Sequence, residues 1–218
     1  ESARKLVRRA LDDTAAEVQQ AALHSISLWK DTGAMDQVVP LLKHKSPQIQ
    51  RVAAEALGRF GKAAVIPALF KALEQPVDRF LEHSLIYALI DIENREATRQ
   101  GLSSESPRVR RAALIALDQM PDGKLQARPV TDALTSTDKP LRETAWWIAG
   151  RHPEWGDSMV TFFQDLLKSK SLTKEEVEEL VARLGRFASN PAIQTMLATR
   201  LIDRTASSAE KILLCRAM

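Results

Sequence analysis

The stretch Ser106–Met120, SPRVRRAALIALDQM, decides the fold. Ser106 is a predicted helix N-cap, because its hydroxyl can accept a hydrogen bond from an unpaired N–H of the first turn. Pro107 then occupies the first helical position, where a missing N–H costs nothing. The apolar residues that follow stand at spacings of 0, +3, +4, +7 and +8, namely Val109, Ala112, Ala113, Ala116 and Leu117. This spacing predicts an amphipathic α-helix, and its alanines let a second helix approach closely.

The same pattern occurs at five places along the chain. When they are aligned on the predicted first buried position, the segments begin at Val18, Ile49, Leu81, Val109 and Leu141, at intervals of 31, 32, 28 and 32 residues. A near-constant interval of about 30 residues is typical of helical-repeat proteins. The stretch around Ser106 is therefore one unit of a repeat, and the repeat predicts the architecture.

A second set of helices with a looser pattern is predicted between these segments. They span Ser2–Leu11, Ala34–His44, Ala63–Leu73, Arg95–Leu102, Lys124–Leu134 and Gly156–Leu167. The last helices are predicted over Ser171–Phe187, Asn190–Ile202 and Ser207–Ala217. About fourteen helices, or seven pairs, predict an all-α fold, a right-handed α–α superhelix that forms a single domain over residues 1–218.

The composition agrees with stacked helices, since 44% of residues are apolar, 27% are charged and only 5% are aromatic. No apolar run approaches the roughly 18–20 residues that span a bilayer, so we expect no membrane insertion in this segment. The first residues are charged and amphipathic, so we expect no signal peptide within this segment. Because the chain begins with Glu1 rather than Met, we expect it to be excised from a longer multidomain protein. Cys215 is the single cysteine, so no internal disulfide can form.

The paired helices resemble the HEAT repeat. A proline lies in the first helix of a pair, as in VVPLLKH and VIPALFKAL, and the second helix has the pattern V-R-x-x-A-x-x-A-L. The short form is similar to the HEAT-like repeats of phycobilisome lyases, most strongly from Val18 to Gly150. In addition, LEHSLIYALIDI, PRVRRAALIALDQM and TAWWIAGRHPEWG resemble the helical region of large multidomain proteins of planctomycete-type bacteria.

This narrower resemblance implies a linker between a β-propeller similar to sugar dehydrogenases and a C-terminal c-type cytochrome domain. It also implies a periplasmic or exported location, whereas a cytoplasmic location would be expected without it. Neither a C-x-x-C-H haem motif nor a propeller blade occurs in these 218 residues. Any implied redox chemistry would therefore belong to other domains, and we expect no cofactor here.

The residues that could perform chemistry are sparse. None of His24, His44, His83 and His152 has the i, i+4 spacing of a metal-binding pair. HEAT-like di-iron hydroxylases have His-Glu pairs on successive repeats, but this chain has only the reversed Glu82-His83. A P-loop, a nucleophile elbow and a dinucleotide-binding glycine pattern are all missing from the sequence. We expect no catalytic residue, no metal site and no enzymatic activity in this segment.

Arginines near the helix starts are candidates for recognition. Arg51, Arg108, Arg110, Arg111 and Arg142 recur at equivalent or neighbouring positions of the repeat. In a solenoid such positions align into stripes, and an arginine stripe on the concave face could bind carboxylates, phosphates or nucleic-acid backbone. The alternative is that each arginine packs over the neighbouring repeat and pairs with a carboxylate. Acidic residues interrupt the stripe, which argues against a nucleic-acid groove.

Aromatic residues provide the second set of candidates. Tyr87, Ile115 and Trp147 each stand six places after the first buried position, where they could form an apolar contact patch. Adjacent helical residues point about 100° apart, so Trp146 and Trp147 can hardly both be buried. Exposed aromatics often anchor protein interfaces, although both tryptophans could instead fill space where the repeats become irregular. The candidate partner-binding residues are Tyr87, Arg110, Arg111, Ile115, Arg142, Trp146 and Trp147.

The leading hypothesis is a non-catalytic scaffold or spacer that contacts a protein partner or neighbouring domains of the same chain. Polar end caps are missing from the pattern, so we expect exposed apolar surface at both ends of the array. The alternative is a DNA-binding HEAT-like enzyme of the alkylpurine DNA glycosylase type, favoured by a pI near 9.1, Trp147 and Glu143. A phycobilin lyase is a third hypothesis. The sequence leaves open whether a small-molecule ligand binds.

Overall fold

The computed structural model describes residues 2–168 and 173–218, which form fourteen α-helices and six 3₁₀ helices. The fold is an α-solenoid of about seven helix pairs, which confirms the predicted all-α class. The predicted helix start at Ser171 lies outside the described residues. Contacts divide the chain into two compact units, Glu1–Leu125 and Gln126–Met218, and each is described by itself. The expectation of a single domain stays a prediction.

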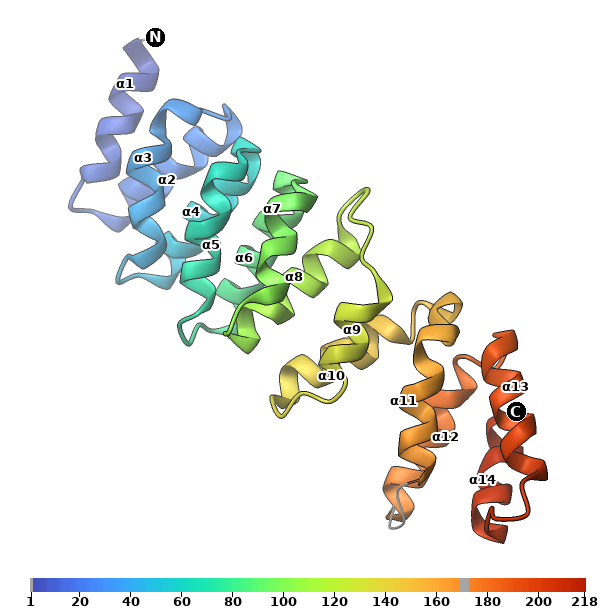
Figure 1. Cartoon of the computed structure of the whole chain (residues 1–218). Helices are drawn as coiled ribbons and strands as arrows, with labels where there is room; N and C mark the ends of the chain where they lie inside the picture. The colour runs from blue at the N-terminus through green and yellow to red at the C-terminus, as the bar shows by residue number, and fades with distance from the viewer. Residues whose placement is uncertain (1, 169–172) are drawn as a thin grey trace. The chain divides into compact units, whose positions relative to one another are not determined.

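Unit 1 consists of a series of helix pairs. Its α-helices are α1 (Ser2–Arg9), α2 (Ala16–Leu28), α3 (Met35–Val38), α4 (Pro47–Phe60), α5 (Ile66–Leu73), α6 (Arg79–Ile92), α7 (Arg95–Arg99) and α8 (Pro107–Gln119). Five 3₁₀ helices adjoin the shorter helices: η1 (Ala10–Asp12), η2 (Thr32–Ala34), η3 (Val39–Lys43), η4 (Ala63–Val65) and η5 (Gln100–Ser103). The long helices α2, α4, α6 and α8 pack on one another in chain order (Figure 1).

The core of unit 1 follows the repeat pattern with one exception. Ile49, Leu81 and Val109 are buried as predicted, but Val18 is 39% exposed, so the prediction was wrong for the first repeat. Helices α1 and η1 pack on α2 but leave Val18 uncovered. Leu23, further along α2, is fully buried, as are Ala54 and Leu114 at the same position of later repeats.

Small residues bring α4 and α6 together. A Cβ atom added at Gly58 would lie 2.9 Å from the Cα atom of Ala88, which is closer than real Cβ atoms approach. Glycine at this position therefore permits near-contact between the two helix backbones.

The start of α8 differs in one detail from the expectation. Ser106 occupies the N-cap position and Pro107 the first turn, but the Ser106 hydroxyl makes no capping hydrogen bond, so that prediction was wrong. Instead, the Ser106 N–H donates to Ser104 Oγ at 3.2 Å, and the Ser106 carbonyl accepts from the N–H of Arg110 at 3.1 Å. The turn before α8 is thus held by hydrogen bonds to residues close to it in sequence.

Unit 2 continues the helical pattern. It contains α9 (Ala127–Ala133), α10 (Lys139–Ala149), η6 (Pro153–Trp155), α11 (Gly156–Lys168), α12 (Lys174–Gly185), α13 (Pro191–Ile202) and α14 (Ser208–Ala217). Helix α11 packs on α13, and α12 packs on α14. The fully buried rings of Phe163 and Phe187 meet edge to face with centroids 5.7 Å apart, and they form the centre of this unit.

The loop before α9 is longer than predicted. Helix α9 begins at Ala127, not at Lys124, so the predicted start of the helix was wrong. Lys124 has a φ angle of 48° and Asp122 one of 53°, both in the left-handed region, which a right-handed helix cannot include.

Large apolar side chains are exposed on the first and last helices. Leu6 in α1 and Leu28 in α2 are 61% and 58% exposed. Ile202 in α13 and Ile212 in α14 are 80% and 62% exposed. The predicted apolar surface at both ends is therefore confirmed.

Candidate functional site

Two of the predicted arginines hold the turns that precede their helices. Arg110 Nη1 donates to the carbonyl oxygens of Ser104 at 2.7 Å and Glu105 at 3.1 Å. Arg142 Nη1 donates to the carbonyl oxygen of Ser136 at 2.5 Å. Both arginines are half-buried. Their guanidinium groups therefore bind backbone of the same unit. The sequence-based alternative expected each arginine to pair with a carboxylate, but these two arginines bind backbone carbonyl groups instead.

The other arginines of unit 1 also make contacts inside the unit. Arg111 of α8 pairs with Glu82 of α6, and the two side chains are 26% and 22% exposed. Arg108 donates to the carbonyl oxygen of Glu74 at 3.3 Å. Arg111 thus pairs with a carboxylate of the neighbouring repeat, as expected if these arginines stabilise the fold rather than bind a ligand.

Exposed aromatic side chains lie along one face of α6. Phe80, His83 and Tyr87 stand at i, i+3 and i+7, which places them on the same side of a helix, and we call them the α6 stripe. Phe80 is 69% exposed and Tyr87 is 54% exposed. The ring of His83 stacks on that of Tyr87 with 6.4 Å between centroids. Ile115, the predicted neighbour of Tyr87, lies half-buried on α8.

Phe80 was not among the predicted site residues, although it is more exposed than Tyr87. It stands at a fixed place, because Asp78 caps α6 and accepts hydrogen bonds from the N–H groups of Phe80 and Leu81, both at 2.8 Å. The guanidinium carbon of Arg51 in α4 lies 5.8 Å from the Phe80 ring centroid. The sequence did hold a signal for its exposure. Phe80 occupies the repeat position that Arg108 occupies in the next repeat, and an arginine at that position indicates a solvent-facing site.

The adjacent tryptophans of α10 occupy different environments. Trp146 is half-buried, with the Arg183 guanidinium carbon 3.9 Å from its ring centroid and the Phe162 ring at 5.3 Å. Burial of this guanidinium lowers the pKa of Arg183. Trp147 is 44% exposed, and Arg151 lies 4.8 Å above its ring. As predicted, the two tryptophans are not both buried.

The predicted apolar patch is only partly assembled within one unit. Tyr87 and Ile115 lie on α6 and α8, which pack on each other in unit 1. Trp147 belongs to unit 2. A patch that contains all three residues therefore stays a prediction.

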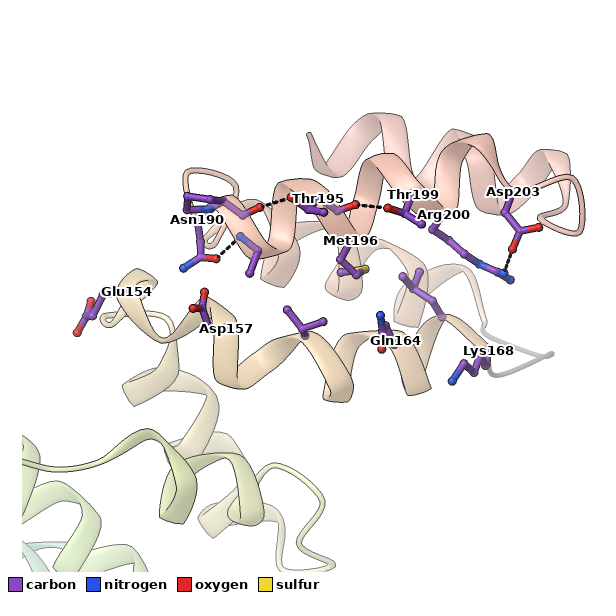
Figure 2. A pocket seen from close by; sticks show the side chains of 14 residues that line it. Glu154, Asp157, Gln164, Lys168, Asn190, Thr195, Met196, Thr199, Arg200 and Asp203 are labelled. Carbon is purple, nitrogen blue, oxygen red and sulfur yellow. Dashed lines mark hydrogen bonds and ion pairs between the residues drawn. The ribbon is translucent and has the colours of Figure 1, made fainter.

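A groove of about 990 Å³ lies between α11 and α13 in unit 2 (Figure 2). Its floor includes Leu167 and Met196, which are 8% and 5% exposed. None of the predicted site residues lines it. The groove closes where the helices start, because a Cβ at Gly156 would lie 2.2 Å from Asn190 Cγ. In the sequence, the only local sign of this close approach of the two helices was the glycine at the start of α11.

The described residues contain neither a metal-binding cluster nor a membrane-spanning helix. Across residues 2–168 and 173–218, no group of three or more His, Cys, Asp and Glu side chains could hold a metal ion. In the same residues, no helix is both long enough and apolar enough to cross a bilayer. Cys215, the single cysteine, is exposed.

Comparisons with known proteins agree with the repeat. A family model of HEAT repeats matches residues 3–90. No curated protein matches the sequence significantly. The CpcE–CpcF complex of phycocyanin lyase from Nostoc is 17% identical, with 99% of this chain and 93% of that chain covered and a TM-score of 0.47.

Two further similar structures are products of design. A designed armadillo repeat protein in complex with the peptide (KR)4 is 14% identical, covering 97% of this chain and 96% of that chain, with a TM-score of 0.41. An engineered protein of known crystal structure is 20% identical. The match covers 90% of this chain and 98% of that chain, with a TM-score of 0.44. At these TM-scores the resemblances add nothing to the argument about function.

Proposed function

We propose that this HEAT-repeat chain is a non-catalytic scaffold that binds a segment of a protein partner along the α6 stripe. The supporting observation is the exposure of Phe80 and Tyr87, at 69% and 54%, on a helix whose leucines are all buried. Large aromatic side chains on a rigid helix are typical anchors of protein interfaces. Arg51 on α4, whose guanidinium carbon lies 5.8 Å from the Phe80 ring centroid, extends the same surface to the neighbouring helix.

The stripe is ordered before any partner arrives. Asp78 fixes the start of α6, Arg51 lies over the Phe80 ring, and His83 stacks on Tyr87. Side chains that are already held in place lose less conformational freedom on binding. Full burial of one large apolar side chain contributes about 1.5–3 kcal/mol, so two such anchors can support a specific contact.

The charges of this surface favour a protein over DNA. Arg111 pairs with Glu82, and Arg59 pairs with Glu55 at 2.8 Å. Basic side chains of α4 and α8 are therefore paired with carboxylates, whereas a DNA glycosylase of the HEAT-like type would need a continuous basic groove. A DNA-binding enzyme remains the weaker alternative.

We further propose that the repeats act as a spacer within a longer protein, between domains such as the dehydrogenase-like and cytochrome domains of the planctomycete-type family. The exposure of Leu6, Leu28, Ile202 and Ile212 on the first and last helices supports contacts with further protein there. In that arrangement the repeats would supply distance and a docking surface, and other domains would supply chemistry.

Site-specific photocrosslinking in the native cell tests the scaffold proposal. p-Benzoylphenylalanine at the position of Phe80 or Tyr87 should crosslink the same protein. The same probe in place of Lys71, whose side chain on α5 is 62% exposed, should not. Once that protein is purified, Phe80→Ala and Tyr87→Ala should weaken its binding and Lys71→Ala should not. Equal crosslinking from all three positions would refute a partner site on α6.

A further inference from the structure

Phe80, the first residue of the α6 stripe, has an arginine on each neighbouring helix. Helix α6 packs on α4 and on α8. From α4, the guanidinium carbon of Arg51 lies 5.8 Å from the Phe80 ring centroid. On α8, Arg108 occupies the repeat position that Phe80 occupies on α6. Its Nη1 atom donates to the carbonyl oxygen of Glu74, in the connection that leads into α6, at 3.3 Å.

No carboxylate neutralises these two arginines. Within the described parts of the chain, Arg51 makes no ion pair, and Arg108 binds only the carbonyl group of Glu74. Arg79, which is exposed next to Phe80, has no ion pair either. Three guanidinium groups at the N-terminal end of the α6 stripe are therefore available to an anion.

The neighbouring carboxylates are largely engaged with other groups. The ion pairs are Glu55 with Arg59 at 2.8 Å, Glu74 with Lys71 at 2.6 Å, and Glu82 with Arg111. Asp78 accepts from the N–H groups of Phe80 and Leu81, where the helix dipole favours a negative charge. Glu105, before α8, is exposed and makes no ion pair among the described residues. Three arginines against Asp78 and Glu105 leave this end of the stripe positive.

The rest of the stripe is uncharged and aromatic. Tyr87 stands seven residues after Phe80, or about 10 Å further along the helix axis, and His83 stacks on its ring. A ligand that covers the stripe would therefore contact apolar rings along its length and cations at one end. Contact with the rings would also exclude water from the arginines, which strengthens an ion pair made there.

This arrangement fits a carboxylate better than a nucleic-acid strand. Arginine binds a carboxylate through two parallel hydrogen bonds, so one acidic side chain can occupy one guanidinium group. A strand carries a negative charge at every nucleotide. Beyond the three arginines it would meet Glu55 and Glu82, whose ion pairs offer it no free cation.

We propose that the α6 stripe recognises an acidic protein segment, in which an Asp or Glu lies within about three residues, or about 10 Å of extended chain, of a large apolar side chain. The apolar side chain covers Phe80, and the carboxylate pairs with Arg51 or Arg108. This inference rests on the proposed function of the stripe and adds the chemistry of its partner. A protein that crosslinks to the stripe but lacks such a segment would refute this inference and leave the proposed function standing.

A phage-displayed library of random peptides tests the proposal, with the whole chain as bait. Peptides selected on the wild-type chain should share a large apolar residue with an Asp or Glu close to it. Phe80→Ser should no longer select them, because the exposed ring that anchors the apolar residue is gone. A selection that yields no shared motif, or a motif without an acidic residue, overturns the proposal.

Charge reversal tests the role of the arginines. The double variant Arg51→Glu, Arg108→Glu should select peptides with Lys or Arg in place of the acidic residue. The control Lys62→Glu reverses an exposed cation at the other end of α4 and should select the wild-type motif. An acidic motif that survives in the double variant would overturn the proposal.

One selected peptide, synthesised with a fluorescent label, gives the size of each effect by anisotropy. Phe80→Ala and the double arginine variant should each weaken its binding at least about tenfold, whereas Lys62→Glu should change it less than about twofold. High salt should weaken binding to the wild-type chain. Circular dichroism verifies that the variants fold. Equal losses in Lys62→Glu and the double variant, or tighter binding of a labelled single-stranded RNA than of the peptide, would overturn the proposal.

Discussion

Arg110 of α8 and Arg142 of α10 make the same hydrogen bond: each donates from Nη1 to the carbonyl oxygen six residues earlier in the chain. Gln194 of α13 donates its side-chain amide to the carbonyl oxygen of Ala188, also six residues earlier. The recurrence of a long donor at the helix start therefore reflects the geometry of the preceding turn. A shared ligand is not needed to explain it.

Loss of one such donor should destabilise its unit. Arg142→Met leaves the Ser136 carbonyl without this half-buried donor, and we expect a loss of about 1–2 kcal/mol in the free energy of unfolding. Urea denaturation followed by circular dichroism measures it. Arg128→Met, at a side chain that is 90% exposed, is the control and should change little. Equal effects of the two changes would contradict the structural role of Arg142.

The ion pair between Arg8 and Asp31 should make unit 1 sensitive to acid. Arg8 donates to both carboxylate oxygens, at 2.8 and 2.5 Å, and Asp31 is 3% exposed. The hydrogen bond from Arg8 holds the pKa of Asp31 below its usual value. A lowered folded-state pKa means that the pair stabilises the fold above the unfolded-state pKa and ceases to do so as pH falls through the folded-state pKa.

Arg8→Met removes this contribution, so wild type and variant should differ in unfolding free energy near neutral pH and converge as pH falls below about 4. Gly33→Ala should act in the same way, since its Cβ would lie 2.3 Å from Arg8 Nη2. Urea titrations at a series of pH values measure the difference. A difference that stays constant down to pH 3 would be inconsistent with the pair.

The α6 stripe should be dispensable for folding. Phe80→Ser and Tyr87→Ser change exposed side chains, and we expect each to alter the free energy of unfolding by no more than about 0.5 kcal/mol. Leu85→Ala, on the buried face of the same helix, should lose about 2–5 kcal/mol. Thermal unfolding compares them. A large loss in either serine variant would mean that the stripe is structural.

Two buried hydroxyl groups should be replaceable with a gain in stability. Ser27 and Thr98 are fully buried, and neither Ser27 Oγ nor Thr98 Oγ1 has a hydrogen-bond partner among the described residues. Ser27→Ala and Thr98→Val remove these unsatisfied groups, and each should raise the free energy of unfolding by about 0.5–1 kcal/mol. Chemical denaturation would detect the change, and a loss instead would reveal a bonded hydroxyl.

DNA should bind only weakly. The net charge is +3, and paired carboxylates interrupt the basic residues of α4, α6 and α8. We expect a labelled DNA duplex to bind no more tightly than the nonspecific range of about 10⁻⁴–10⁻⁶ M at physiological salt. Fluorescence anisotropy over a salt series measures this. Nanomolar binding would favour the glycosylase-type alternative.

The helices could be predicted from sequence because their signals are local. Spacings of three and four residues set the buried face of α8, and Val109 and Leu117 are buried as that spacing requires. Val18 broke the pattern because α1 and η1 leave it uncovered. The Ser106 hydroxyl makes no capping bond, and the hydrogen bond at this turn is instead donated by the Ser106 N–H to Ser104 Oγ.

The groove could not be predicted, because it depends on the separation of two helices that are distant in sequence. The contact of Gly156 with Asn190 fixes α11 against α13 at one end, and nothing in either segment alone indicates how far apart the helices lie beyond it. The exposure of Phe80, in contrast, had a local signal, because Arg108 stands at the same position of the next repeat.

The environment of Trp146, with a guanidinium on its ring and Phe162 at its edge, also gives unit 2 a built-in optical signal. An indole shielded in this way emits at shorter wavelength than one in water, and its emission shifts when the shielding is lost. Of the four tryptophans, only Trp29 lies in unit 1. Intrinsic fluorescence therefore reports mainly on unit 2, while circular dichroism reports on both, and a lag between the two traces would reveal units that melt independently.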